Sequence, residues 1–387
     1  MHILVMSRST LSHGFGGFER QCEDLCGGFV KAGHKVTVLT TSRQDGVEEE
    51  ERSGYRVKFL SPSTPMKLSR TWFNRALSEI REIHRVDPID VIHSNEFAAK
   101  GTMGWAKKNG IPIAIVCHGS LRTELLSFLS AADMRPRYWH WLILTPLHLL
   151  RRCLLWEMPM RRAAKSIVLV SPTLSKDFKM FSEGKVKVIE NGIALPENSS
   201  DGSTGEEIRL LCTGRADKQK GFQTAIRAVS EIDDMPLHLD IIGTGPYLED
   251  LKKISRDLRT DERVTFHGRV TDDELNLAYS SADIYLIPTT RYEGLPLALL
   301  EAMSHGIPTI SSEIGGNSDV ITHNHDGIFI RPGNLPELIS AIRKLGNDQQ
   351  ERRRISKAAR ATTERRFNKE RMINETLQTL ESLTDKS

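Results

Sequence analysis

The sequence predicts an α/β protein built from two Rossmann-like domains, and three observations lead to this prediction. Its 387 residues exceed what one hydrophobic core usually supports, so two domains are expected. Short apolar runs of strand length alternate with segments of helical periodicity, which is typical of parallel sheets covered by helices. Several of these runs end in a glycine-containing turn, at the position where open α/β sheets bind ligands.

The composition is that of an ordinary globular protein, with 39% hydrophobic and 27% charged residues. Residues 1–195 contain 28 Lys and Arg against 19 Asp and Glu, whereas residues 196–387 contain 25 against 31. The basic first half indicates either an anionic partner or solvated surface charge. Five scattered cysteines without metal-ligand spacing indicate a reduced, cytoplasmic protein. We expect no signal peptide, because the apolar run at 1–6 is too short and lacks a basic start. We expect no membrane-spanning helix, because no apolar run reaches 18 residues.

The first half predicts a series of buried strands separated by helices. A glycine-rich loop at 12–20 follows the first strand and begins a helix that ends near residue 32; such a loop can cradle a phosphate. Residues 47–52 are expected to form an acidic, solvated turn. His118 follows a strand directly and is either a satisfied structural histidine or a functional one. The predicted strands are 2–6, 35–40, 55–60, 90–93, 111–117, 166–170 and 186–189, and the further predicted helices are 71–85, 96–109 and one that Ser171 caps.

Residues 135–162 combine Trp, Leu and Arg in an unusual density. One interpretation is a helix that lies in the plane of an anionic membrane interface. The other is a domain helix that buries its leucine face and keeps its arginines outside. The sequence leaves both open.

The second half begins after a linker at 196–207, which has no large apolar side chain. Thr271 is expected to cap an acidic helix start. The predicted strands are 208–213, 237–242, 264–267, 283–288, 309–312 and 327–330, and the last predicted helices are 335–345, 351–361 and 365–383.

The loop that follows strand 283–288 combines a helix N-terminus with two carboxylates. Gly294 precedes a predicted helix at 296–305, and a helix N-terminus behind a glycine binds anions. Glu293 lies in the same loop and Glu301 about two turns into the helix; a carboxylate can hold a pair of sugar hydroxyls. Sugar hydroxyls beside a diphosphate describe a nucleotide sugar.

A pair of cations follows the first strand of the second half. Arg215 and Lys220 lie in the turn between strand 208–213 and the next helix. Two cations at the carboxyl end of a strand can neutralise a diphosphate, Arg through a planar fork and Lys as a point charge. Loop cations are also often only solvated.

These motifs together resemble the retaining glycosyltransferases of family 4. The likeness rests on the Glu-x7-Glu pair in E-G-L-P-L-A-L-L-E-A-M-S-H-G-I-P at 293–308, on G-R-x4-K-G at 214–221 and on G-G-F-E-R at 16–20. It covers nearly the whole chain and is strongest from Gly214 to Gly306. The sequence departs from the family pattern at Ala194, where an aspartate is common.

The resemblance implies a GT-B fold, in which two Rossmann-like domains face each other across a deep cleft. It places an acceptor-side domain at 1–195, the linker at 196–207 and a nucleotide-sugar-binding domain at 208–364. The helix at 365–387 is expected to cross back onto the first domain.

The resemblance also implies roles for individual residues. His118 would contact the donor sugar near its reacting carbon, Glu293 would hold sugar hydroxyls, and Arg215 and Lys220 would stabilise charge on the leaving diphosphate. Glu301 would hold the ribose hydroxyls. The residues implied in donor binding are Gly16, Gly17, Gly243, Arg269, Val270, Gly294, Leu295 and Glu301.

The implied reaction is transfer of a hexosyl group, with retention, from a UDP-sugar or a GDP-sugar to a hydroxyl of a glycan or lipid-linked acceptor. Synthesis of a cell-envelope polysaccharide or glycoconjugate is expected, in the cytoplasm or at the inner face of the membrane. We expect no metal and no cofactor, because the chain has no Asp-x-Asp motif and the two cations already face the diphosphate. Nucleic-acid binding is not expected, since no such motif is present.

Two other classes of function compete with this one. A catalytically silent nucleotide-sugar-binding scaffold would keep the cleft but break the motif residues. A GT-B relative with other chemistry, such as an epimerase or a phosphorylase, would lack the Glu-x7-Glu setting. The intact motifs favour the transferase.

Overall fold

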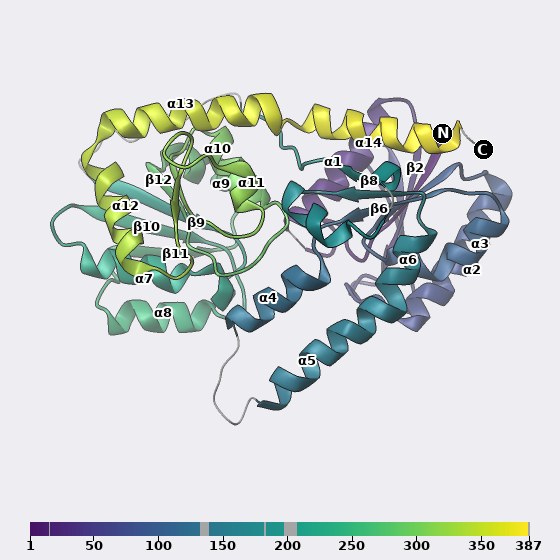
Figure 1. The fold of residues 1–387 in the computed structure, drawn as a ribbon, viewed down its shortest axis with the longest axis horizontal. Helices are drawn as coiled ribbons and strands as arrows, with labels where there is room; N and C mark the ends of the chain where they lie inside the picture. The colour runs from purple at the N-terminus through teal and green to yellow at the C-terminus, as the bar shows by residue number, and fades with distance from the viewer. Residues whose placement is uncertain (15, 132–138, 182, 197–206, 386–387) are drawn as a thin grey trace. The chain divides into compact units, whose positions relative to one another are not determined.

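The computed structural model describes all residues except 15, 132–138, 182, 197–206 and 386–387 (Figure 1). Its chain divides into two compact units. Unit 1 comprises Met1–Arg122, Arg135–Asn191 and Lys369–Ser387, and unit 2 comprises Thr123–Met134 and Gly192–Asn368. The expected linker at 196–207 lies almost wholly outside the described residues. Within the described part, we find no helix long and apolar enough to cross a membrane.

The described residues of unit 1 form an eight-stranded sheet with the order β3-β4-β2-β1-β5-β6-β7-β8. All neighbours are parallel except β3 and β4. The central strands are buried along their whole length, as expected for a parallel sheet covered on both faces. The strands are β1 His2–Met6, β2 Lys35–Thr41, β3 Glu49–Arg52, β4 Tyr55–Leu60, β5 Val91–Asn95, β6 Ile113–Cys117, β7 Ser166–Leu169 and β8 Val186–Val188.

Strand β3 corrects one prediction, since 47–52 was expected to be a solvated turn. Residues Glu49–Arg52 instead pair antiparallel with β4 at the edge of the sheet. Glu49 lies opposite Lys58, and Glu51 lies opposite Arg56, so the acidic residues face basic partners across the ladder. Opposite charges stabilise such a pair, and a charged edge strand resists pairing with other chains.

Two helix predictions in unit 1 also need correction. The helix expected at 96–109 is divided into a 3₁₀ turn at Ala98–Thr102 and a short α-helix. Gly101 in this turn packs closely on Phe73 of the helix at Arg70–Val86. The segment after Ser171 is a 3₁₀ helix, and the Ser171 side chain makes no capping bond. The helices of unit 1 are α1 Gly17–Lys31, α2 Arg70–Val86, η1 Ala98–Thr102, α3 Met103–Lys108, α5 Trp139–Arg152, η3 Cys153–Glu157, α6 Met158–Ala163, η4 Pro172–Phe178, η5 Glu183–Lys185 and α14 Lys369–Thr384.

The C-terminal helix α14 packs against α1 within unit 1. A Cβ atom on Gly28 of α1 would lie 2.5 Å from the Cδ1 atom of Ile373, so the absence of a side chain there permits the close approach. The ammonium group of Lys369 lies 3.3 Å from the carboxylate of Asp24. The last helix therefore completes the unit that the first strand begins.

Unit 2 contains a six-stranded parallel sheet with the order β11-β10-β9-β12-β13-β14. Counted along the chain from β9, this is the order 3-2-1-4-5-6 of a doubly wound nucleotide-binding sheet, whose switch point lies between β9 and β12. The strands are β9 Ile208–Thr213, β10 Leu237–Ile242, β11 Val264–Gly268, β12 Ile284–Ile287, β13 Thr309–Ser312 and β14 Ile328–Ile330.

Alternate residues of β9 point into two different cores. Leu210 and Cys212 pack in the core that contains α7 and α12, while Leu211 packs with Tyr279 of α9 and Ala302 of α10. Figure 1 shows α7 and α8 on one side of the sheet and α9 and α10 on the other. The helices of unit 2 are α4 Leu121–Ala131 from Thr123 onward, η6 Lys218–Lys220, α7 Phe222–Glu231, α8 Leu248–Asp257, α9 Asp272–Ser281, α10 Leu297–Ser304, α11 Asn317–Val320, α12 Leu335–Asn347 and α13 Gln349–Arg366.

Candidate functional site

The two loops at the switch point of unit 2 meet through an ion pair. Lys220 lies after β9, Glu293 lies after β12, and the Lys220 Nζ atom donates to Glu293 Oε1 at 2.5 Å. Both side chains are about four-fifths buried. Burial works to raise the pKa of Glu293, but the charge and hydrogen bond of Lys220 outweigh it, so that the pKa lies below its usual value. The Glu293 carboxylate is therefore ionised at neutral pH.

Arg215 lies on the same loop as Lys220 but extends into solvent. Its side chain is 69% exposed, and its Nε atom lies 3.3 Å from the carboxylate of Asp217. The structure thus places both predicted cations after β9, one held against Glu293 and one accessible from outside. An exposed guanidinium can rotate to meet a phosphate, since its surface ion pair is weak.

The backbone of Glu293 and Gly294 is fixed by the loop that follows β13. The Gly316 amide donates to the Glu293 carbonyl at 2.9 Å. A Cβ atom on Gly316 would lie 1.4 Å from the Gly294 carbonyl oxygen, so only glycine permits this approach. The sequence analysis did not anticipate this contact between residues 315–316 and the Glu293 loop.

The loop after β10 packs on the loop after β9 in a similar way. Gly243 has a φ of +137°, and a Cβ atom there would lie 1.9 Å from the Gly214 carbonyl oxygen. The Gly243 amide donates to the Gly268 carbonyl at 2.7 Å, which links this loop to the end of β11. Arg269 and Val270 follow directly, at the same edge of the sheet. Close backbone contacts therefore join the loops after β9 and β10, and likewise the loops after β12 and β13.

Glu301 lies in α10, one turn from the start of the helix rather than two as predicted. Its Oε2 atom accepts a hydrogen bond from the Tyr279 hydroxyl at 3.0 Å. The Tyr279 hydroxyl also lies 2.9 Å from the Thr213 hydroxyl, which in turn lies 2.6 Å from the Tyr285 hydroxyl. Burial raises the pKa of Tyr279, so its hydroxyl stays protonated and can donate.

This tyrosine network was missed by the sequence analysis. The sequence analysis included Tyr285 only as part of the predicted strand 283–288, and it did not single out Tyr279. Their hydroxyl groups could have revealed the network. Two tyrosines and Thr213 lie on one face of adjacent elements, and buried hydroxyl groups need hydrogen-bond partners.

Helix α4 contributes to the same region of unit 2. The Tyr292 amide donates to the Ser127 hydroxyl at 2.9 Å, and the Ser130 hydroxyl donates to the Thr290 carbonyl at 2.9 Å. The Gln219 side chain, from the loop after β9, donates to the Ser127 carbonyl. The sequence analysis placed this segment in the first domain and assigned it no role; its helical periodicity could have shown the helix but not its partner.

In unit 1, His118 follows β6 and faces the start of α1. Its ring lies edge-on to Phe18, with centroids 4.9 Å apart, and the Arg8 guanidinium lies 4.9 Å from the centre of the Phe18 ring. Burial, with the Arg8 charge acting in the same direction, lowers the pKa of His118 to about 3. The imidazole is therefore neutral at physiological pH.

The predicted loop glycines lie at the start of α1. Gly16 precedes the helix, and Gly17 is its first residue. Glu19 is buried behind them, and its Oε1 atom accepts from the Ser9 hydroxyl at 2.5 Å. The structure thus brings Gly16, Gly17 and His118 to the same edge of the unit 1 sheet.

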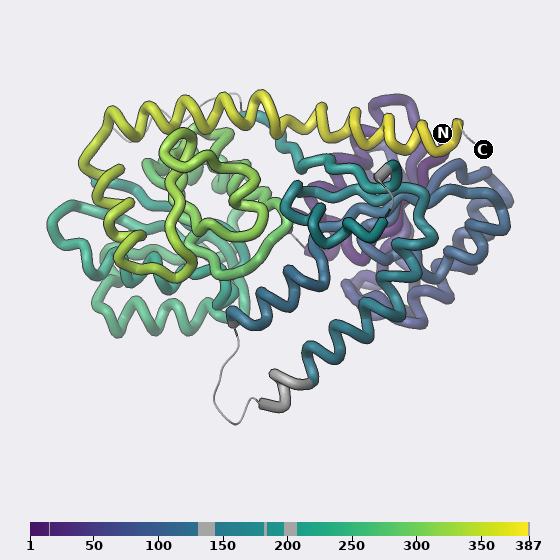
Figure 2. Tube along the Cα trace, viewed as in Figure 1, coloured from purple at the N-terminus to yellow at the C-terminus, as the bar shows by residue number. Residues whose placement is uncertain are grey.

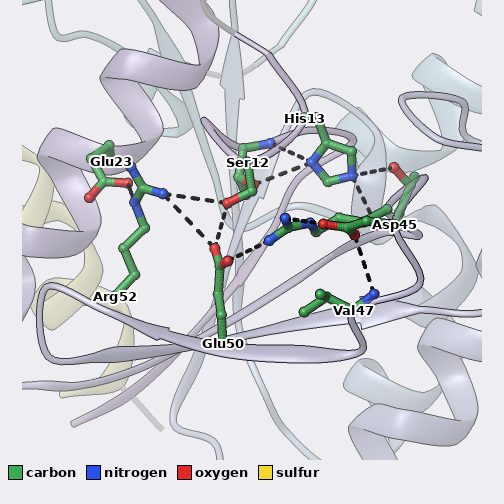
Figure 3. A network of polar contacts seen from close by, with 10 residues as sticks. Ser12, His13, Glu23, Asp45, Val47, Glu50 and Arg52 are labelled. Carbon is green, nitrogen blue, oxygen red and sulfur yellow. Dashed lines mark hydrogen bonds and ion pairs between the residues drawn. The ribbon is translucent and has the colours of Figure 1, made fainter.

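A polar network anchors the part of this loop that precedes Gly16 (Figure 3). The Ser12 hydroxyl donates to Glu50 of β3 at 2.5 Å, and Arg43 lies 2.7 Å from the same carboxylate. Arg52 bridges Ser12 and Glu23 of α1, at 3.4 Å and 2.7 Å. The acidic edge strand therefore holds the glycine-rich loop, a role that the sequence analysis did not anticipate.

The division into units separates the predicted site residues. Unit 2 contains Arg215, Lys220, Gly243, Arg269, Val270, Glu293, Gly294, Leu295 and Glu301, and unit 1 contains Gly16, Gly17 and His118. Leu295 is buried in the core next to the loop. In the portion of the chain that the structure describes, no group of three or more His, Cys, Asp or Glu side chains could hold a metal ion.

Known protein families match the chain over most of its length. Residues 15–196 match Glycosyltransferase Family 4, and residues 197–362 match glycosyl transferases group 1. The sulfoquinovosyl transferase SQD2 of Arabidopsis thaliana is 27% identical over 366 residues, which cover 90% of this chain and 67% of that protein.

Two further proteins are informative about ligands. The alpha-monoglucosyldiacylglycerol synthase of Streptococcus pneumoniae is 27% identical over 301 residues, 73% of this chain and 64% of that protein. The structure of Anabaena Alr3699/HepE in complex with UDP and glucose is similar with a TM-score of 0.75 at 18% identity, over 99% of this chain and 100% of that chain. At this identity the structural similarity shows a shared fold.

Proposed function

The chain belongs to glycosyltransferase family 4 and has the GT-B fold, and on that premise we propose that it moves a sugar from a nucleoside diphosphate sugar to an acceptor hydroxyl, with retention at the anomeric carbon. One observation carries this proposal. Lys220, Arg215 and Glu293 lie on loops at the switch point of a doubly wound sheet, and Glu301 lies one turn into the helix that follows. That is where such sheets bind nucleotides.

The ion pair at the switch point suits a donor that carries both charge and hydroxyls. The Lys220 ammonium has three donor hydrogens, so it can keep Glu293 and also reach a phosphate. Glu293 accepts only, which matches sugar hydroxyls. Arg215, exposed on the same loop, would close on the diphosphate as a planar fork.

Glu301 would hold the ribose of the same donor. A carboxylate offers about four acceptor positions, so Glu301 can bind Tyr279 and a ribose hydroxyl together. The Tyr279 hydrogen bond fixes the orientation of the carboxylate before the donor arrives. A preoriented group loses little conformational entropy on binding.

In the proposed reaction the bond between the anomeric carbon and the diphosphate oxygen breaks, and a bond to the acceptor oxygen forms on the same face. The proton of the acceptor hydroxyl passes to the leaving phosphate. Lys220 and Arg215 stabilise the charge on that phosphate, and removal of one such preorganised donor typically costs about 3–4 kcal/mol of transition-state stabilisation. His118, neutral at physiological pH, would contact the sugar through a hydrogen bond rather than through charge.

We propose that the reaction requires no metal ion or cofactor, since Lys220 and Arg215 supply the positive charge that a metal would bring to the diphosphate. Activity should therefore be unchanged after exhaustive treatment with EDTA. Loss of activity in EDTA, restored by a divalent cation, would contradict this part of the proposal.

A UDP-sugar is the favoured donor and a GDP-sugar the second choice, since the similar HepE structure contains UDP. The acceptor would be a glycan or a lipid-linked molecule, as the name of the diacylglycerol glucosylating relative suggests. With such an acceptor, the protein would take part in the synthesis of cell-envelope polysaccharide or glycoconjugate, in the cytoplasm or at the inner membrane face.

Thermal denaturation with a panel of UDP-, GDP- and ADP-sugars tests the donor class. A ligand present at a hundred times its dissociation constant should stabilise the protein by about 2.7 kcal/mol. The shift should appear with one base, disappear in Glu301→Ala and persist in Glu249→Ala, an exposed glutamate of α8. If no nucleotide sugar raises the melting temperature, the proposal fails.

The alternative of a silent nucleotide-sugar-binding scaffold needs a second measurement. The protein is incubated with the donor that gives the shift, and release of the nucleoside diphosphate is followed with candidate acceptors and with water. Turnover supports the transferase. Tight binding of the donor without any release would favour the scaffold.

A further inference from the structure

The outward side of α5 and η3 carries a row of exposed leucines. Five of them are between 47% and 61% exposed, and we call them the leucine face: Leu144, Leu147, Leu150, Leu154 and Leu155. Leu144, Leu147, Leu150 and Leu154 recur at spacings of three and four residues on one continuous helix, and Leu155 adjoins Leu154, so the five share one side of it. An exposed apolar row of this kind on a folded domain indicates an interaction surface.

The opposite side of the same helix is already occupied. Leu149, Cys153 and Met160 are buried in unit 1. Buried Glu157 is ion-paired with Arg152 and with Arg161, each at 2.9 Å. Of the two interpretations that the sequence left open, the one that buries the leucines is wrong for the leucine face. Its other part holds for Arg151 and Arg162, which are exposed.

The exposed side of the segment is positively charged. Residues 139–165 contain five cationic residues and one acidic residue, Glu157, which is the buried one. Arg151 is exposed between Leu150 and Leu154, and Arg162 and Lys165 are exposed at the end of the helix. A surface that combines leucines with cations complements an anionic, partly apolar partner.

The geometry points to a lipid bilayer as that partner. A single convex helix offers no groove for a peptide, and Figure 2 shows α5 extending away from the strands of its unit. Leucines of such a helix can enter the acyl boundary while the arginine stems let their head groups reach the lipid phosphates. We propose that the leucine face lies in the interface of an anionic membrane, with the axis of α5 in the membrane plane.

This inference goes beyond the proposed function and does not depend on it, because it rests on the surface of unit 1 alone. A protein that transferred no sugar could still bind lipid through this helix. The test therefore uses no nucleotide sugar.

The test is co-sedimentation of the full chain with phosphatidylcholine vesicles, with and without phosphatidylglycerol. We expect binding to the anionic vesicles. The double variant Leu147→Ser/Leu154→Ser should weaken it by at least about tenfold, since two apolar side chains no longer enter the acyl boundary. Leu277→Ser, at a leucine of α9 that is 67% exposed, is the matched control and should bind as the wild type does.

The charge of the face is tested separately. Arg151→Gln should lower the affinity for anionic vesicles about fivefold, since one arginine near a membrane surface contributes about that factor. Arg256→Gln, at an exposed arginine of α8, should not change it. Glu301→Ala should keep full vesicle binding, which separates this inference from the proposed donor site.

Three outcomes would overturn the proposal. The protein could bind neither vesicle, or the leucine double variant could bind as tightly as the wild type. Sedimentation velocity without lipid could also show a dimer that the double variant dissolves, in which case a second copy covers the leucine face. Because the substituted leucines are exposed, the variants should keep the wild-type melting temperature, which confirms that they fold.

Discussion

The carboxyl edges of the two sheets have the same topology but carry different residues. In both units the loop after the first strand and the loop after the fourth parallel strand meet at a switch point. In unit 2 these loops carry charged residues, Lys220, Arg215 and Glu293. In unit 1 the Arg8 guanidinium, after β1, lies 4.0 Å from the Glu96 carboxylate, after β5. The same guanidinium lies over the ring of Phe18, and the neutral His118 packs against that ring.

The difference teaches that the strand order supplies a place for a ligand and the loop residues supply the chemistry. Unit 2 has the side chains that the proposed diphosphate and sugar hydroxyls would require, and its loops are held by close backbone contacts. The unit 1 edge is anchored by a polar network on its outer strand instead. The predictions that follow would break or sharpen this contrast, and they run from the largest expected effect to the smallest.

The positive charge of Lys220 at the unit 2 edge should be essential for activity. Lys220→Gln should lower kcat/KM about 10²- to 10³-fold, because the leaving diphosphate loses a preorganised cation. Lys218→Gln, an exposed lysine of the same short helix, is the matched control and should stay near the wild type. Equal loss in both variants would mean that the loop needs only net positive charge.

The close backbone contacts of the unit 2 loops should be essential for the stability of the fold. Gly316→Ala should destabilise the protein by roughly 3 kcal/mol, because its Cβ atom would collide with the Gly294 carbonyl. Urea unfolding measures this effect. Gly104→Ala, where no atom lies within 4 Å of the added carbon, should not destabilise. A neutral result at Gly316 would show that the Glu293 loop can shift freely.

The neutral histidines of unit 1 should make it sensitive to acid. Burial lowers the pKa of His93 from 6.5 to about 4, so the unfolded chain takes up a proton below pH 6.5 while the folded chain does not. The neutral His93 therefore contributes fully to the free energy of unfolding above pH 6.5, and this contribution is lost as the pH falls towards 4. At pH 5 the loss should be about 2 kcal/mol.

The variant His93→Leu should remove that part of the pH dependence, measured as the change in unfolding free energy between pH 7 and pH 5. His325→Leu, at an exposed histidine of unit 2, is the control. If the pH dependence of His93→Leu equals that of the wild type, His93 does not stay neutral in the fold.

The tyrosine network should strengthen donor binding without being essential for it. Tyr279→Phe removes the hydrogen bond to Glu301, which is worth about 1 kcal/mol, so the donor KM should rise about fivefold with little change in kcat. Tyr247→Phe, at a tyrosine beside α8, is the control. A fall in kcat at constant KM would contradict a positioning role.

The strands could be predicted from the sequence because buried parallel strands read as continuous apolar runs. Strands β1, β4, β9, β10 and β13 have the predicted bounds. The capping box of Thr271 and Glu274 also has a purely local signature, and the structure contains it. Prediction was weakest for β3, since a charged edge strand looks like a loop until its partner strand is known.

The candidate site follows the same division. The order of strands and helices determined that Lys220 and Glu293 would each follow a strand of one sheet. Only the tertiary structure decided that they pair with each other, that Tyr279 orients Glu301 and that Ser127 of α4 holds the Tyr292 loop. Likewise the sequence contained the leucines of α5, but only the fold decided which side of the helix faces solvent. The physical reason is that residue type and spacing fix local structure, whereas contacts between residues tens or hundreds of positions apart depend on how the elements pack.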